Sequence, residues 1–219
     1  MKLQLNYKGK DYIKIEELVG KAYADISSFF KDELGNLIIC VHKGRKEFDK
    51  KLSRQTKLWE VANVMNGQID IIHIDYFEKE SSHKTQEFFP ILKHEITHLF
   101  IERITSGKSI PRWLNEGLAS FVSGQHKDIN FPIYIERDFC EKLGTPKGWD
   151  DHSSYDAYNT SSLFVSFLVQ KYTLDKLIKL ISRLERNYYH SHFKAIFKDL
   201  FEKDIEDLEK EFVDKVNLI

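Results

Sequence analysis

The sequence predicts an α+β protein in which a sheet-rich first part precedes a helical remainder. Two observations lead to this fold class. Short β-rich runs, punctuated by Gly35-Asn36 and Asn66-Gly67, occur in the first eighty residues, whereas apolar residues recur at helical spacing from Pro90 almost to the end. The chain has 219 residues, enough for one sizeable core. We therefore expect a single domain over residues 1–219, with the sheet in about 1–106 and a helical lobe in about 107–219.

Strands and one helix are expected in the first part of the chain. Leu3–Tyr7 alternates apolar and polar residues, and Leu37–His42 contains mostly residues that favour strands. Between them, Ile15–Lys31 has apolar residues at helical spacing. Trp59–Val64 and Gln68–Tyr76 indicate two strands joined by a tight Asn-Gly turn. The mixed polarity of Gln68–Tyr76 favours an edge strand with one face partly open.

Helices are expected through most of the remainder. Pro90 suits the first turn of a helix that continues to about Thr105, and Gly107 ends it. Pro111 precedes the next helix, and Gly124 follows it. The expected helices after Pro90 therefore cover residues 90–105, 112–122, 132–143, 158–172, 174–187, 191–201 and 205–216, with a loop at 144–151.

Composition and charge exclude several classes of function. The net charge is −1, and basic residues alternate with acidic ones, so no basic surface for nucleic acid is expected. The apolar runs are too short for a membrane span, and no signal peptide is visible, which favours a cytoplasmic location. Cys40 and Cys140 have no zinc-binding spacing and are expected to be two separate thiols.

The segment His94-Glu95-Ile96-Thr97-His98 is the main chemical motif of the sequence. Residues four apart lie on one face of a helix, so His94 and His98 can direct their imidazoles at a single ion. Glu95 lies beside the first histidine, where it can act as a general base without binding the metal. A catalytic zinc ion has three protein ligands and one open position. A third ligand is therefore expected elsewhere in the chain.

Glu116 is the best candidate for this third ligand. It lies in Pro111-Arg-Trp-Leu-Asn-Glu-Gly-Leu-Ala119, the helix expected next after the histidine helix. A short connection allows the two helices to pack antiparallel, with Glu116 facing the two histidines. Gly117 would keep the second helix thin and let it approach the first closely. Asn115 is expected either to orient a ligand or to cap the helix.

His-Glu-x-x-His followed by Asn-Glu-Gly-Leu-Ala resembles the gluzincin metallopeptidases, the peptidase MA group of aminopeptidase-like and thermolysin-like enzymes. This resemblance implies one Zn²⁺ per chain, bound by His94, His98 and Glu116, with Glu95 as the base. It also implies a thermolysin-like zincin fold, in which a mixed N-terminal sheet with an edge strand over the cleft precedes a mainly helical lobe.

The resemblance extends over roughly residues 60–215 but departs from the family at one place. Aminopeptidases of the group carry Gly-x-Met-Glu-Asn on a strand before the zinc helix, where the glutamate holds the free amine of the substrate. The corresponding Val64–Ile74 has no such glutamate. The sequence therefore favours cleavage within a peptide over removal of its first residue, and Gln68–Ile74 is a candidate strand for pairing with the substrate.

A downstream tyrosine stabilises the oxyanion in this family, and Tyr158 is the preferred candidate. Tyr155, three residues earlier, is the alternative. His152 is expected to be a solvated loop residue, and His73 a hydrogen-bonded or exposed histidine and not a ligand.

The predicted function is hydrolysis of peptide bonds in a peptide or protein substrate, by zinc-activated water with Glu95 as the base. Two alternatives stay open. One is a zinc hydrolase acting on another amide, and the other is an inactive peptidase-like domain that binds a partner. The presence of all four required side chains disfavours the second alternative.

Overall fold

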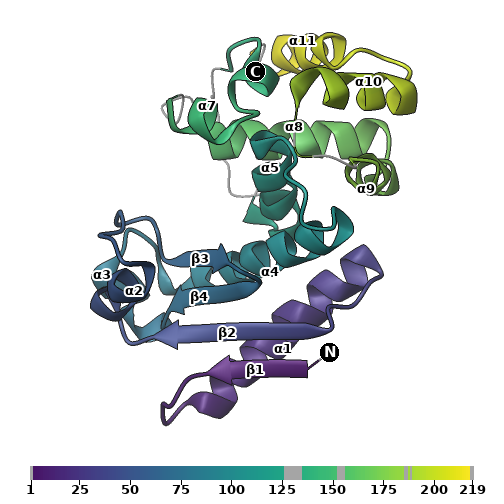
Figure 1. Ribbon diagram of the computed structural model, residues 1–219. Helices are drawn as coiled ribbons and strands as arrows, with labels where there is room; N and C mark the ends of the chain where they lie inside the picture. Colours follow the sequence, from purple (N-terminus) through teal and green to yellow (C-terminus); the bar gives the residue numbers. More distant parts are fainter. Residues whose placement is uncertain (1, 126–134, 152–155, 185–186, 188, 218–219) are drawn as a thin grey trace. The chain divides into compact units, whose positions relative to one another are not determined.

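The computed structural model describes residues 2–125, 135–151, 156–184, 187 and 189–217 (Figure 1). It is an α+β protein with a small mixed sheet and a mostly helical C-terminal part, as the sequence predicted. The chain forms two compact units, Met1–Phe100 and Ile101–Ile219, each with its own hydrophobic core. That the whole chain acts as one domain stays a prediction.

The sheet of the first unit has four strands in the order β1-β2-β4-β3. Strands β1 (Lys2–Asn6), β2 (Asn36–His42) and β4 (Gln68–Ile72) are parallel, and β3 (Ala62–Met65) is antiparallel to β4. A parallel pair needs a long crossover connection, which helix α1 (Tyr12–Phe30) provides between β1 and β2.

The predicted Asn-Gly turn is confirmed, but the predicted edge strand is wrong. Asn66 and Gly67 both have positive φ, 53° and 71°, as the two-residue turn between β3 and β4 requires. However, β4 pairs with β2 on one side and with β3 on the other, so it is an interior strand. The polar residue Asp70 made its pattern look half-exposed.

Asp70 is fully buried because its carboxylate has two partners on the sheet. His42 Nε2 lies 2.7 Å from Oδ1, and Gln68 Nε2 donates a hydrogen bond of 2.8 Å to Oδ2. Desolvation alone would raise the pKa of Asp70, but these contacts with His42 and Gln68 hold that pKa below its usual value. Asp70 is thus buried because its carboxylate is hydrogen-bonded, although the sequence pattern predicted a partly exposed position.

Strand β3 is an edge strand of this sheet. The Ile72 amide donates to the Val61 carbonyl, and in an antiparallel pair every second residue bonds to the partner strand. Ala62 and Val64 therefore direct their N–H and C=O groups away from β4, towards the open edge.

Helices α1 and α4 (Phe88–Ile104) cover one face of the sheet (Figure 1). Phe100 of α4 stacks on Phe30 of α1 with 5.3 Å between ring centroids. The ring of Tyr23, also on α1, lies 5.9 Å from the ring of Phe100. The helix expected from Pro90 onwards is confirmed, beginning two residues earlier than expected. Its apolar residues are buried: Ile91, Leu92, Ile96, Leu99 and Phe100.

Helix α2 (Arg45–Leu52) was not expected from the sequence. Its residues are almost all charged, and Phe48 is its one buried side chain, packed 5.9 Å from the ring of His42. One apolar contact leaves no helical period to detect. The shorter elements that follow the sheet are η1 (Ile74–Tyr76), α3 (Phe77–Glu80) and η2 (Thr85–Glu87).

Arg45, the first residue of α2, holds the segment that leads into β3. Its guanidinium donates hydrogen bonds to four main-chain carbonyls, those of Lys57, Leu58, Glu60 and Glu80. The bonds are 2.8–3.1 Å long. Residues 53–61 contain no helix or strand, so this one side chain supplies much of their hydrogen bonding.

The second unit is built around α5 (Arg112–Ser123) and α8 (Ala157–Lys171). Gly117 of α5 faces α8, where an added Cβ would lie 2.5 Å from the Ser161 carbonyl oxygen. Gly117 was expected to allow close approach to the histidine helix. The contact shows that it allows close packing against α8 instead.

The remaining helices of this unit differ in part from expectation. Residues 144–151 were expected to be a loop, but they contain the short helix α7, which begins at Pro146. Proline is a residue type suited to the first turn of a helix. The helix expected at 174–187 ends at Ser182. The helix expected at 132–143 falls partly outside the described residues. The helices are α6 (Phe139–Lys142), α7 (Pro146–Asp151), α9 (Leu174–Ser182), α10 (His190–Phe201) and α11 (Ile205–Val216).

Aromatic side chains form the core of the second unit. Phe164 of α8 contacts the rings of Trp113, Phe139 and Phe212, with centroids 5.3, 5.1 and 5.1 Å away. Such pairs contribute roughly 0.5–1.5 kcal/mol each beyond the area they bury. They fix α5, which carries the candidate ligand Glu116, against α8.

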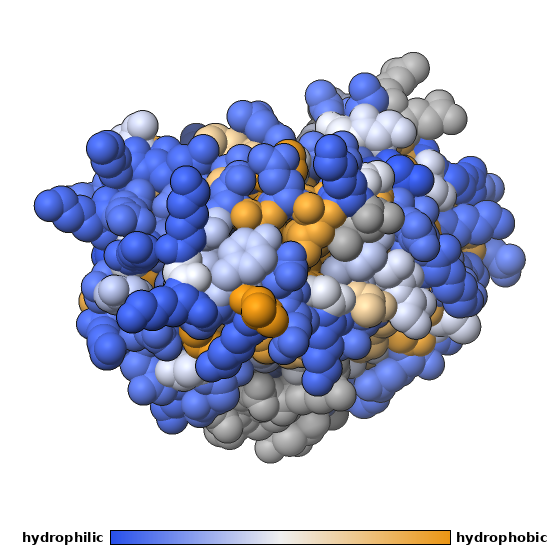
Figure 2. All heavy atoms as spheres, turned by 90° about the horizontal axis from the view of Figure 1, so that it is seen from below, coloured by the Kyte–Doolittle hydropathy of each residue, from blue (hydrophilic) through white to orange (hydrophobic). Residues whose placement is uncertain are grey.

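The surface view in Figure 2 shows mainly hydrophilic residues, with hydrophobic ones gathered near the middle of that face. Within the described residues, every helix is too short or too polar to cross a bilayer. Cys40 and Cys140 are free thiols, as expected.

Glu209 of α11 is a carboxylate in the core of the second unit, with 4% of its surface exposed. Its Oε1 accepts a hydrogen bond of 3.2 Å from the Cys140 amide. Desolvation raises the pKa of Glu209 to about 7. The amides of Cys140 and Phe139 oppose this rise, whereas the negative charges of Asp138 and Glu206 add to it.

We expect Glu209 to make the chain less stable as the pH rises. The folded-state pKa is above the unfolded value of 4.5, so its contribution is fully present below pH 4.5 and is lost as the pH rises through about 7. Glu209→Gln keeps the hydrogen-bond acceptor and removes the titration. Relative to the parent chain it should gain stability between pH 5 and 8, on the order of 3 kcal/mol, measured by urea unfolding.

The exposed Glu202→Gln is the control and should follow the parent chain at every pH. Equal pH dependence of the free energy of unfolding in the parent chain and in Glu209→Gln would contradict the prediction.

Candidate metal centre

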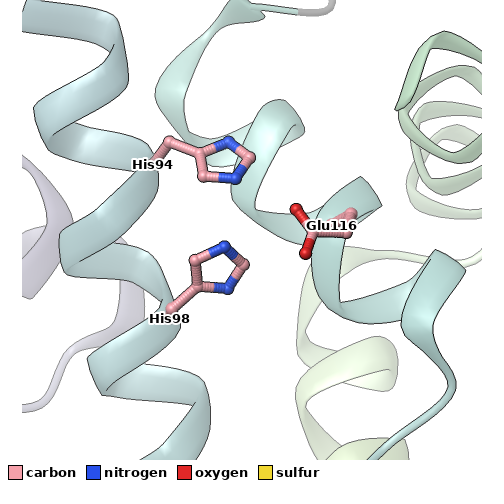
Figure 3. A group of neighbouring side chains, drawn as sticks. All are labelled: His94, His98 and Glu116. Atoms are coloured by element: carbon pink, nitrogen blue, oxygen red, sulfur yellow. The ribbon is translucent and has the colours of Figure 1, made fainter. Parts of the chain in front are cut away.

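Helix α4 carries both histidines of the motif on one face (Figure 3). His94 and His98 are one turn apart, and their ring centroids are 4.7 Å from each other at an interplanar angle of 78°. His94 is 8% exposed, and His98 is half-buried. The buried apolar residues around them, such as Ile96, fix the helix and therefore the direction of both rings.

Helix α5 carries Glu116, whose side chain is directed towards the two histidines (Figure 3). Each of the three residues offers one ligand atom, and these atoms all lie within 4.8 Å of one another. Glu116 is 5% exposed. A buried carboxylate needs a cation or hydrogen-bond donors to compensate the cost of its desolvation.

The donor set is two imidazoles and one carboxylate, without cysteine. These are the ligand types of catalytic zinc sites, in which three protein ligands leave the fourth position open. The residues present therefore fit a zinc ion.

Arg112 is a neighbour of Glu116 that the sequence analysis did not single out. Its Nε lies 3.0 Å from Glu116 Oε1, one helical turn away. The guanidinium also packs on the Trp149 ring, 5.6 Å from the ring centroid. The i,i+4 spacing of an arginine and a glutamate on a helix was the available sequence signal for this pair.

The other candidates of the sequence analysis have the following places. Glu95 follows the first histidine on α4 and is half-buried. Tyr158 is in the first turn of α8, 36% exposed, and its ring meets Trp149 edge-on at 5.0 Å. The alternative Tyr155 and the loop residue His152 lie outside the described residues. Asn115 does not cap α5, because Pro111 occupies the cap position.

A second group of possible ligands, in the first unit, is explained by hydrogen bonds. Asp11, His73 and Asp75 also offer ligand atoms within 4.8 Å of one another. His73 Nδ1 accepts a hydrogen bond from the Asp75 amide, which leaves the proton on Nε2, 2.9 Å from Asp11 Oδ2. Neither ring nitrogen then has a lone pair for a metal. His73 is thus hydrogen-bonded and buried, and that it is not a ligand stays a prediction.

Tyr7 completes this second group and ties the end of β1 to the end of β4. Its hydroxyl donates a 2.6 Å hydrogen bond to Asp11, and its ring stacks on His73. Desolvation and the hydrogen bond to Asp11 raise the pKa of Tyr7 to about 12, and the same bond lowers the pKa of Asp11. The group therefore has a structural explanation within the first unit.

The chain was compared with protein-family models and with curated proteins. Residues 89–217 match the family model described as the Peptidase MA superfamily. No curated protein matches the chain. The matched region is more than half of the chain, and it includes both the His-Glu-x-x-His segment and Glu116. The chain therefore belongs to the peptidase MA superfamily, a gluzincin group of metallopeptidase-type hydrolases, as its resemblance predicted.

Proposed function

We propose that this protein is a zinc-dependent peptidase in which His94, His98 and Glu116 bind one zinc ion. The observation that carries the proposal is the convergence of these three side chains from α4 and α5 (Figure 3). Zinc, when bound, supplies a Lewis acid that polarises the scissile carbonyl and makes water more acidic. The proposal includes a thermolysin-like zincin fold for the chain.

Glu95 is the general base of the proposed reaction. It takes a proton from the attacking water and delivers it to the leaving amine. Its position supports this role, because Glu95 directly follows the proposed ligand His94 in the sequence. Glu95 is half-buried, and many of the residues near it on α4 are apolar. A carboxylate there can reach the water without occupying the open ligand position.

Tyr158 is the residue that donates a hydrogen bond to the developing oxyanion. Two observations support it. The side chain is partly exposed, and the buried ring of Trp149 packs edge-on against it and limits its rotation. Preorganised donors of this kind need no reorganisation during the reaction.

Strand β3 is the proposed binding strand for an extended substrate. Ala62 and Val64 present outward-facing N–H and C=O groups at the open edge of the sheet, and main-chain pairing there requires no particular side chains. Such pairing suits cleavage within a peptide. The absence of a Gly-x-Met-Glu-Asn glutamate supports the same preference.

The test is the zinc content of the purified chain together with turnover of a peptide library. We expect about one zinc ion per chain, turnover that a chelator abolishes, and recovery when zinc is added back. Zinc with hydrolysis of simple amides but of no peptide would indicate the non-peptidase alternative. Peptide binding without turnover of any substrate would indicate an inactive binding domain. Either result would contradict the proposal.

A further inference from the structure

Arg112 lies beside the candidate ligand Glu116, and most hydrogen-bond donors of its guanidinium have no acceptor among the described residues. The two side chains form an ion pair over 3.0 Å, but the Arg112 N–H is not aligned for a hydrogen bond to the carboxylate. The closest atoms of the pair are Nε and Oε1. A guanidinium binds a carboxylate best through two parallel N–H groups, and this pair does not have that geometry.

The Arg112 side chain is the more exposed member of this ion pair. Arg112 is 40% exposed, whereas the Glu116 side chain beside it is 6% exposed. Within the part of the chain that the structure describes, neither Nη1 nor Nη2 forms a hydrogen bond. The planar end of the guanidinium is therefore available to a ligand, next to a proposed metal ligand.

Trp149 holds this guanidinium in place. The cation lies 5.6 Å from the centroid of the indole ring, and Trp149 itself is buried. A guanidinium stacked on a fixed ring loses less conformational freedom when it binds a partner than one that is free in solvent. Tyr158, the proposed oxyanion donor, packs edge-on against the same ring. Arg112 is thus linked through Trp149 to the proposed reaction site.

The N-terminus of α5 is not an alternative source of positive charge. The Arg112 amide donates to the Gly144 carbonyl over 2.8 Å, and the Trp113 amide donates to the Leu143 carbonyl over 3.0 Å. Two of the helix's first N–H groups are therefore already satisfied. The side chain of Arg112 is left as the group that can attract an anion here.

Metal binding would increase this attraction. A divalent cation bound to Glu116 would neutralise the carboxylate that now compensates Arg112. The positive charge of the guanidinium would then be available to another anion. In a partly desolvated site a charge of this kind interacts more strongly than it does in bulk water.

We propose that Arg112 binds a carboxylate of the substrate, so that the enzyme prefers peptides with a carboxylate beside the scissile bond. This inference rests on the proposed peptidase function. Two sources supply the same chemistry: an acidic side chain, and the free C-terminus of a short peptide. The planar fork of Arg112 matches either one through two parallel hydrogen bonds.

The experiment compares four peptides on the zinc-loaded full-length chain. One pair differs by Glu or Gln next to the cleaved bond, and the other pair by a free or an amidated C-terminus. We expect kcat/KM to be about 10–100-fold higher for the carboxylate member of one pair, mainly through a lower KM. Hydrogen bonds between charged groups strengthen binding by about this factor. The pair that shows the preference identifies the source of the carboxylate.

Variants of Arg112 then assign the preference to this side chain. Arg112→Gln should abolish the preference, and Arg112→Lys should retain part of it, since lysine keeps the charge without the fork. Arg183→Gln is the control, because Arg183 is also 40% exposed and lies in the same unit. Direct binding of each peptide to the zinc-loaded Glu95→Gln variant, by calorimetry, gives a second readout without turnover.

The outcomes separate this inference from the proposed function. If the parent chain cleaves no peptide at all, the peptidase function is wrong. If it cleaves peptides but makes no distinction within either pair, the function stands and the role of Arg112 is wrong. A preference that survives in Arg112→Gln, or a variant that loses only zinc affinity, would also overturn the inference.

Discussion

We expect peptide turnover to fall by about 10²–10⁴-fold when Glu95 is replaced by glutamine, while the zinc content stays at the parent level. Glutamine has nearly the same size and stays on the same face of α4, so His94 and His98 keep their positions. Its amide cannot accept the proton of the attacking water. The loss should appear in kcat, because the proton is transferred in the transition state and not on binding.

Glu102→Gln is the matched control for this prediction. Glu102 is on the same helix, about two turns further along, and is exposed. It should leave both turnover and zinc content unchanged. A Glu95→Gln variant with full activity on a peptide would show that another group acts as the base, whatever the metal content.

Replacing Glu116 with glutamine is expected to weaken zinc binding by at least about 100-fold. Loss of an outer partner of a metal ligand typically costs 10–100-fold in affinity, so removal of the charge of a ligand itself should cost more. The affinity can be measured by competition with a chromophoric chelator. Zinc should also raise the melting temperature of the parent chain, and this shift should be smaller in the variant.

This measurement needs no substrate, so it tests the ligand assignment separately from the activity. Glu141→Gln, an exposed glutamate of α6, should bind zinc as the parent chain does. Equal zinc affinity in Glu116→Gln and in the parent chain would remove Glu116 from the ligand set. The third ligand would then have to come from elsewhere.

Much of the secondary structure could be predicted because its signals are local. The helix of His94 has buried apolar residues on either side of the motif, and the turn at Asn66 and Gly67 uses residues that tolerate positive φ. Both signals lie within a few neighbouring positions. Helix α2 gave no such signal, because only Phe48 among its residues is buried.

The order of the strands could not be predicted, because it depends on distant partners. Gln68–Ile72 looked like an edge strand since it contains a charged residue, Asp70. That carboxylate is buried because His42, on another strand, compensates it. Nothing within the strand itself indicates such a partner. The edge strand is consequently β3 and not β4, and β3 is therefore the strand proposed to bind an extended substrate.

The candidate ligands of the metal centre could be predicted from the sequence, whereas the roles of the residues around them could not. Imidazole and carboxylate side chains at fixed spacing restrict the chemistry strongly, and the structure brings His94, His98 and Glu116 together. Arg112 was adjacent to the quoted motif but was not assigned a role. Its importance comes from Trp149, which follows it by 37 positions in the sequence and was not linked to it.

The network of Arg45 has a consequence for which positions of the chain are free to vary. Arg45 binds carbonyl groups of the main chain, and every residue type supplies a carbonyl. The bonds from Arg45 to Lys57, Leu58 and Glu60 therefore do not depend on the side chains of these three residues. Leu58 and Trp59, both exposed, can diverge among relatives without loss of the loop. Exposed side chains of the segment before β3 can thus change while the main-chain bonds to Arg45 stay in place.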